Sequence, residues 1–154
     1  MFKKHFFSLI EASQIEPNRL IIQLYERKTH HNLSSYLETL QAIRDRGIRI
    51  CIDNFGSSNA SIEYMKHFHF DMVQFDRDYV VHLDEEQRQT LFKSLIEMSK
   101  QLNITTVAKW VDNPSQNEKL KLLGINYAQG FAIGGSITYE ELLELQKTNQ
   151  RNTQ

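Results

Sequence analysis

Five short apolar runs recur along the chain, and a stretch with helical periodicity separates each run from the next. The runs are rich in isoleucine and valine and cover residues 20–26, 48–53, 71–76, 104–111 and 125–133. Strands that alternate with helices at this spacing are typical of parallel β/α units. Near-continuous apolar strands indicate a sheet that is covered on both faces. The pattern therefore predicts one α/β domain built on about five parallel strands.

The segments between the runs carry apolar residues at helical spacing together with start and stop signals. Asp84 with Gln87 is interpreted as a capping box, and Gly124 as a stop signal. The polar end of the chain is expected to fray, which places the domain at 1–147 and a polar tail at 148–154. The expected helices cover residues 2–14, 34–46, 60–66 and 84–102, one that Pro114 opens with Ser115 and Glu118, and one that Thr138 opens with Glu141.

Composition excludes several classes of function. The 154 residues carry a formal net charge of −1, which gives no electrostatic case for binding a nucleic-acid polymer or an anionic membrane. No run approaches the length of a membrane span. The single cysteine, Cys51, excludes a disulfide within the chain and fits a reducing compartment. We therefore predict a cytoplasmic protein.

Polar residues stand near the end of every expected strand. Because side chains alternate along a strand and parallel strands end at one edge, these residues are expected to converge. β/α enzymes place their chemistry at such tips. The ordinary alternative is that strand ends are polar because they meet solvent. The five residues are Gln23, Asp53, Gln74, Lys109 and Gln129.

Four motifs resemble those of EAL domains, the cyclic di-GMP phosphodiesterases of bacterial signalling. The segment 53–65, Asp-Asn-Phe-Gly-Ser-Ser-Asn-Ala-Ser-Ile-Glu-Tyr-Met, resembles the family loop that starts Asp-Asp-Phe-Gly-Thr-Gly. The segment 71–76 resembles Asp-x-(Leu/Val)-Lys-Ile-Asp. The segment 107–112, with Gln116 beyond it, resembles Ala-Glu-Gly-Val-Glu-x-x-x-Gln. The segment 123–131 resembles Leu-Gly-Cys-Asp-x-x-Gln-Gly-(Tyr/Phe), so the resemblance covers nearly the whole chain.

The resemblance implies a TIM-like (β/α) barrel that hydrolyses cyclic di-GMP with two Mg²⁺ or Mn²⁺ ions. In such enzymes the metal ligands are carboxylates and amides at successive strand tips, and a lysine helps to place the attacking water. The Glu-Ala-Leu signature and an early asparagine ligand belong to strands upstream of the part matched here. The chain is therefore expected to form a partial barrel that corresponds to the C-terminal part of an EAL barrel.

Four functional positions of the family, and the glycine next to one of them, carry a different residue in this chain. Gln23 occupies the position of a glutamate ligand of the family, and Asn54 that of the second aspartate of the loop. Gln74 occupies the position of the lysine, and Lys109 that of the glutamate of Ala-Glu-Gly. Trp110 replaces the glycine of the same motif, and it is expected to plug the site or to pack on a neighbour.

Three matched functional positions survive: Asp53, Gln129 and Glu26, which in the family steadies the catalytic loop. The substitutions remove negative charge and add the ammonium group of Lys109. An ammonium near a divalent ion costs about 4 kcal/mol per unit-charge pair at about 4 Å. We therefore expect no catalytic residue, no metal and no cofactor, and an ion pair between Lys109 and Asp53.

The resemblance and the departures leave three function classes open. The favoured one is a catalytically inactive module that works through protein contacts in cyclic di-GMP signalling. The second is a receptor that binds cyclic di-GMP without hydrolysis. The third is a residual phosphodiesterase that a partner completes, with Mg²⁺ or Mn²⁺.

Five strands cannot close an eight-stranded barrel, so the outer strands are expected to expose their edges. We expect these edges, or the helices flanking the 54–65 loop, to bind a protein partner or a second copy and so form a dimer. Two alternatives are a separate polypeptide that completes the barrel, and an N-terminal helix that folds back as a plug through Phe2, Phe6 and Phe7.

Overall fold

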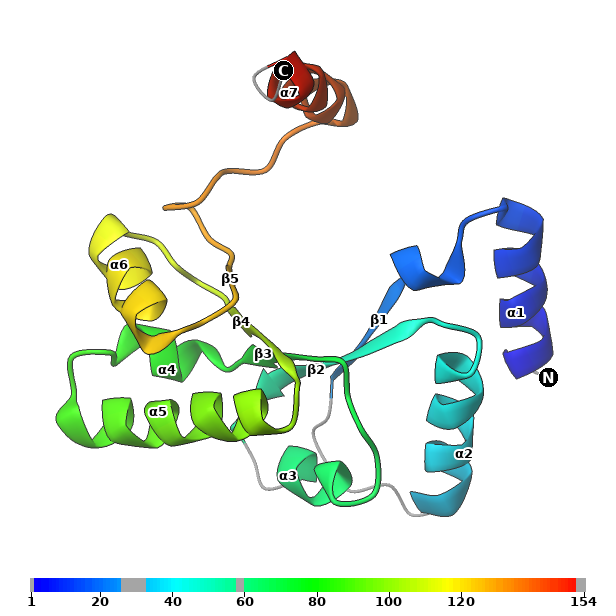
Figure 1. Ribbon diagram of the computed structural model, residues 1–154, viewed down its shortest axis with the longest axis horizontal. Coiled ribbons are helices and arrows are strands. Elements are labelled where there is room, and N and C mark those ends of the chain that lie inside the picture. Colours follow the sequence, from blue (N-terminus) through cyan, green and yellow to red (C-terminus); the bar gives the residue numbers. More distant parts are fainter. Residues whose placement is uncertain (1, 26–32, 58–59, 152–154) are drawn as a thin grey trace.

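The computed structural model of the chain describes residues 2–25, 33–57 and 60–151, and its centre is a parallel sheet (Figure 1). The strands run in the order β1-β2-β3-β4-β5, with parallel pairing throughout. This confirms the predicted α/β class and the five parallel strands. The strands are β1 (Ile21–Tyr25), β2 (Arg49–Phe55), β3 (Met72–Phe75), β4 (Thr105–Ala108) and β5 (Tyr127–Ala128).

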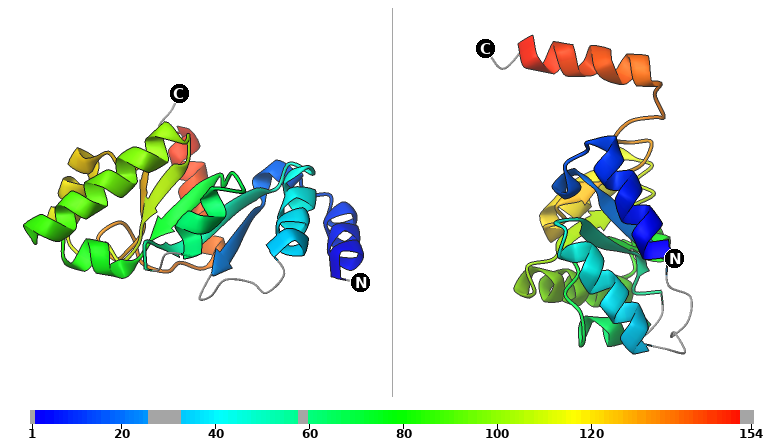
Figure 2. Two further views of the ribbon diagram at one scale, coloured as in Figure 1. Left: turned by 90° about the horizontal axis from the view of Figure 1, so that it is seen from below. Right: turned by 90° about the vertical axis from the view of Figure 1, so that its right-hand side faces the viewer.

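The helices α2 to α5 lie on one side of the sheet, and the last helix lies on the other side and apart from it (Figures 1 and 2). Among the described residues, no helix is both long enough and apolar enough to cross a membrane. The elements are α1 (Phe2–Ser13), η1 (Pro17–Arg19), α2 (Leu33–Arg44), α3 (Ala60–Met65), α4 (Arg77–Val81), α5 (Glu86–Gln101), α6 (Pro114–Leu123) and α7 (Tyr139–Arg151).

The core lies between the sheet and the helices that cover it. Ile50, Ile52 and Phe55 of β2 are fully buried, because β2 has a strand on each side and helices against its outer face. The rings of Phe75 on β3 and Phe92 on α5 meet edge-on at 4.8 Å. Burying side chains of this size contributes roughly 1.5–3 kcal/mol each, so this layer supplies most of the stability of the sheet.

The start of α5 corrects one predicted cap. The N-cap residue is Glu85 and makes no side-chain cap hydrogen bond, so the predicted capping box of Asp84 with Gln87 is wrong. The Asp84 carboxylate instead pairs with the ammonium of Lys119 on α6. The chain also contains a helix that was not predicted, α4, whose N-cap Asp76 accepts a hydrogen bond from the Asp78 amide at 2.9 Å.

The cap of α6 differs from the predicted one by two residues. Asn113 and Gln116 form the capping box, in place of Ser115 with Glu118. The stop at Gly124 is confirmed, because this residue caps α6 in the left-handed conformation. The predicted box of Thr138 with Glu141 is also confirmed, since each backbone amide donates to the other side chain. Helix α7 continues to Arg151, so the proposed boundary at residue 147 falls inside it.

The N-terminal helix folds back at the β1 side of the sheet through Phe6 and Phe7, two of the three residues predicted for it, while the Phe2 side chain lies outside the described ones. Phe7 is buried in the core, and the Arg46 guanidinium lies 3.4 Å from the centroid of its ring. Helix α1 therefore packs beside the C-terminal end of α2, at the outer flank of the sheet (Figure 1).

Gly130 holds the segment after β5 against the segment after β4. Its φ is +156°, and a Cβ atom there would lie 2.3 Å from the Val111 carbonyl oxygen and 2.4 Å from the Val111 nitrogen. Two hydrogen bonds surround this contact: Val111 N donates to the Gln129 carbonyl, and Ala132 N donates to the Val111 carbonyl. Because the obstacle is backbone, a side chain cannot be accommodated without separating the two segments.

We expect Gly130→Ala to lower the free energy of unfolding by about 3 kcal/mol, since it overpacks a site bounded by backbone. Urea unfolding followed by circular dichroism measures the change. Gly134→Ala is the matched control, because a Cβ at Gly134 meets nothing within 4 Å. Equal midpoints for the two variants would contradict the close approach at Gly130.

Candidate functional site at the strand tips

The structure brings the predicted tip residues together on the open side of the sheet. Gln23 on β1 and Gln74 on β3 belong to strands that are not neighbours, yet Gln23 Nε2 donates to Gln74 Oε1 at 3.0 Å. This contact spans β2, where the register partner of Gln23 is the small residue Cys51. The curvature of the sheet thus brings the Gln23 and Gln74 side chains into contact, whereas the sequence alone predicts only that both lie at the same edge of the sheet.

An ion pair occupies the centre of this site. Lys109 follows β4, and its ammonium group donates to Asp53 Oδ1 and, at 3.2 Å, to Asn54 Oδ1. The side chains of Lys109 and Asp53 are only 17% and 14% exposed. The Asn54 backbone amide donates to the same Asp53 oxygen at 2.7 Å. The structure therefore confirms the predicted pairing of Lys109 with Asp53.

Two residues of the site adopt the left-handed backbone conformation. Asn54 has φ +53°, which asparagine tolerates, and Trp110 has φ +64°, which is costly for a bulky side chain. The Trp110 side chain is half exposed, and the Arg77 guanidinium lies 4.9 Å from its ring. Trp110 therefore packs on a neighbour, one of the two predicted alternatives, in a backbone shape that suits the glycine found there in EAL domains.

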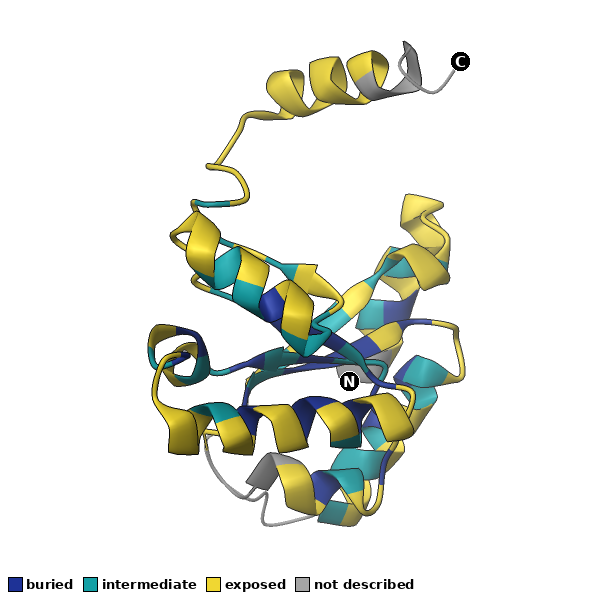
Figure 3. Cartoon of the chain, turned by 60° about the vertical axis from the view of Figure 1, so that its left-hand side comes forward, coloured by how far each residue is buried: buried dark blue, intermediate teal, exposed yellow. Residues whose placement is uncertain are grey.

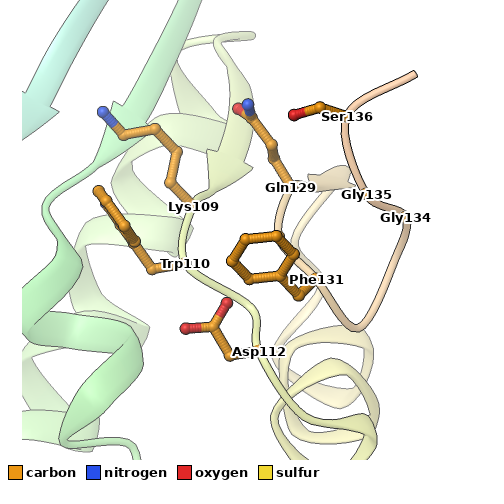
Figure 4. A pocket seen from close by; sticks show the side chains of 9 residues that line it. Lys109, Trp110, Asp112, Gln129, Phe131, Gly134, Gly135 and Ser136 are labelled. Carbon is orange, nitrogen blue, oxygen red and sulfur yellow. The ribbon is translucent and has the colours of Figure 1, made fainter. Parts of the chain in front are cut away.

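A pocket of about 460 Å³ opens beside Lys109 (Figure 4). Lys109 and Trp110 stand on one side of it, Gln129 stands beside Ser136, and Phe131, which is 79% exposed, stands in the middle of the lining. The Gly134-Gly135 turn and Ser136 form the wall opposite Trp110. The lining thus offers two aromatic side chains and the Asp112 carboxylate, while the Lys109 ammonium donates to Asp53 and Asn54.

Cys51 lies beneath the ion pair and offers no nucleophile. Burial, and then the nearby Asp53 carboxylate, raise the pKa of its thiol to about 12. A thiol with this pKa stays protonated at neutral pH, and the thiolate is the reactive form. Cys51 is thus a small buried residue of β2.

The donor set does not fit a divalent metal. Mg²⁺ and Mn²⁺ require several oxygen ligands, and some of them must be anionic. Of the five residues predicted at the strand tips, Asp53 alone is a carboxylate, and it is paired with the Lys109 ammonium, while Asp76 at the end of β3 caps α4. In the described part of the chain no three His, Cys, Asp or Glu residues cluster in a way that could hold a metal. Glu26, the other surviving carboxylate position, lies outside the described residues.

Sequence reasoning missed two residues of the site, Arg77 and Phe131. Arg77 comes directly after Asp76 at the tip of β3, and this position alone could have placed it among the residues of the site. Phe131 was assigned to a longer fifth strand, 125–133. The strand ends at Ala128, so Phe131 projects into the pocket from a loop. The fourth strand is likewise shorter than the predicted 104–111.

Comparison with known proteins finds one family throughout. The EAL domain family model matches residues 1–136. The chain is 33% identical over 113 residues to the cyclic di-GMP phosphodiesterase PdeB of Shewanella oneidensis, a match covering 73% of the chain and 13% of PdeB. Across eight curated relatives the chain spans between 13% and 25% of the relative's length.

Solved EAL structures share the fold. The Pseudomonas aeruginosa MucR phosphodiesterase in complex with cyclic di-GMP superimposes with a TM-score of 0.79 at 26% identity, covering 88% of this chain and 56% of that one. The Klebsiella pneumoniae BlrP1 complex with manganese and cyclic di-GMP gives 0.76 at 23% identity, covering 84% and 33%.

Proposed function

Because the chain belongs to the EAL domain family, we propose that it is a catalytically inactive EAL module that acts in cyclic di-GMP signalling through protein contacts. We assign it to the cytoplasm, where cyclic di-GMP signals are read. We propose a domain over 1–147 followed by a polar segment, 148–154, of which residues 148–151 form the end of α7. No residue is assigned a catalytic or metal-binding role.

The observation that carries this proposal is the ion pair of Lys109 with Asp53. The ammonium group lies against the only carboxylate among the tip residues, so it holds the position that a divalent cation would need. A cation approaching Asp53 meets a like charge, at a cost of roughly 4 kcal/mol per unit-charge pair at about 4 Å. The neighbouring Asn54 and Gln74 are neutral amides, which provide no compensating negative charge.

The test is a turnover assay on the 154-residue chain with cyclic di-GMP and Mn²⁺. We expect no linear dinucleotide above the blank by chromatography, while PdeB of Shewanella oneidensis, assayed in parallel, produces it. Circular dichroism establishes that the assayed chain is folded. Linear product from the purified chain would overturn the proposal in favour of a residual phosphodiesterase.

A second candidate is a receptor that binds cyclic di-GMP without hydrolysis. The pocket beside Lys109 favours it, because two exposed aromatic side chains, Trp110 and Phe131, can stack on the bases of a nucleotide. Calorimetric titration with cyclic di-GMP distinguishes this role, and Mn²⁺ should leave the result unchanged because the described residues form no cluster that could hold the ion.

The protein contacts are proposed to involve the outer strands and the helices beside the 54–65 loop. In the described sheet β1 and β5 each pair with one neighbour, and Ile21, Tyr25 and Tyr127 on them are about half exposed. Ile62 on α3 and Val81 on α4 are also exposed. We propose that a partner or a second copy covers such surface.

A further inference from the structure

Helix α7 forms no part of the core. The side chains of residues 139–148 are all exposed, and the helix stands clear of the sheet (Figure 3). An isolated helix of 13 residues is marginal in water, since most helices are stabilised by packing an apolar face. The capping box of Thr138 with Glu141 supports its first turn, but a cap contributes only about 1 kcal/mol. The helix therefore needs a surface to pack on.

The apolar face of α7 is well defined. Tyr139, Leu142 and Leu143 recur at helical spacing, and their side chains are 70%, 43% and 36% exposed. The charged residues Glu140 and Glu144 project from the other side of the helix. The Gly134-Gly135 turn joins the helix to β5, and a Cβ at either glycine would meet no atom within 4 Å.

A matching acceptor lies at the opposite edge of the sheet. A groove of about 390 Å³ runs between α1 and β1, and seven of its eight lining residues are apolar. Leu9, Ile15 and Ile21 in this lining are between 42% and 57% exposed. We call it the α1–β1 groove. It is a surface on which an amphipathic helix can bury its leucines.

The charges around the two surfaces are of opposite sign. The described residues of α7 carry three glutamates against Lys147 and Arg151, a net charge of −1. Near the lining residues in sequence or register stand three exposed basic residues and two exposed acids, a net charge of +1: Lys4, Arg19, Arg49, Glu11 and Glu16. The two surfaces thus differ in sign by one charge each, and opposite signs favour association.

We propose that α7 of one copy docks in the α1–β1 groove of a second copy. Donor helix and acceptor groove lie at opposite edges of the same sheet, so each copy can give its helix and receive another. Such an exchange covers the apolar face of α7 and the flank of β1 in one step. The proposal specifies the self-association proposed above and rests on no claim about catalysis.

Cysteine cross-linking tests the exchange. Leu9→Cys is placed on one chain and Leu142→Cys on another of different tag length, and the two are mixed and oxidised. The native Cys51 is buried and does not interfere. We expect a covalent heterodimer on a non-reducing gel. Leu122→Cys mixed with Leu142→Cys is the control, because Leu122 lies on α6 outside the groove and is 88% exposed.

Light scattering supplies the second readout. We expect the unmodified chain to be a dimer or larger at micromolar concentration, and Leu142→Glu to raise its dissociation constant at least about tenfold, because a buried leucine is lost. Leu122→Glu should leave it unchanged. A monomeric parent chain, a dimer that persists in Leu142→Glu, or a heterodimer no more abundant than the one formed with Leu122→Cys would each overturn the exchange. None of these results bears on the turnover assay.

Discussion

Asp53→Ala is expected to lower the free energy of unfolding by about 3 kcal/mol. The change leaves the Lys109 ammonium group facing only the Asn54 amide oxygen, in a position where its side chain is 17% exposed. It also removes the acceptor of the Asn54 backbone amide. Removing one partner of a largely buried ion pair costs about 3–5 kcal/mol, and the remaining solvent access places this pair at the low end. Urea unfolding measures the difference.

The chain offers a matched control in its other Lys–Asp pair. Lys119 and Asp84 are 37% and 82% exposed, so Asp84→Ala should cost at most about 1 kcal/mol. The double variant Asp53→Ala/Lys109→Met should recover part of the loss, because no unpaired charge remains buried. If Asp53→Ala and Asp84→Ala lowered the free energy of unfolding equally, the ion pair of Lys109 with Asp53 would contribute no more to stability than an exposed pair.

Restoring acidic residues at two positions should create a site for Mn²⁺. Asn54→Asp/Lys109→Glu lowers the local charge by three units and removes the ammonium group that repels a cation. Because one unit-charge pair at about 4 Å represents roughly 4 kcal/mol, we expect the affinity for Mn²⁺ to rise at least about a hundredfold over the parent. Isothermal titration with MnCl₂ measures it.

A control of equal charge isolates the effect of position. Asn18→Asp/Lys93→Glu makes the same chemical change at two exposed residues. The restored variant is expected to lose stability without Mn²⁺, since adjacent carboxylates repel one another, and to regain it when the ion binds. If the parent chain or the surface variant bound Mn²⁺ as tightly, the substitutions at the strand tips would not explain the loss of a metal site.

The sheet was predictable because its signal is spread over many residues. Each of the five strands rests on a run of isoleucine and valine, and parallel pairing follows from the helices between them. The pairing of Lys109 with Asp53 was also predictable, since both lie at the carboxyl ends of their strands, β4 and β2, on the same edge of the sheet, and carry opposite charge. Such inferences need only strand order and side-chain alternation.

Features that depend on tertiary contacts were not predictable. Asp84 has the sequence of a cap, but the ammonium of Lys119, 35 residues away, holds it instead. The sequence predicts a fifth strand of nine residues, 125–133. The strand ends at Ala128, because Gln129 and Ala132 on either side of Gly130 are hydrogen-bonded to Val111 instead. The contact of Arg77 with Trp110 joins the first residue of α4 to the segment after β4, and no local pattern connects the two.

The ammonium group at the strand tips is a cation that cannot leave. Unlike a dissolved ion, Lys109 is supplied with the polypeptide itself, at an occupancy set by the fold. The geometry around Asp53 is therefore expected to be the same whether the cell is replete with or starved of magnesium and manganese. A module built in this way would read its signalling environment without also reporting on metal supply.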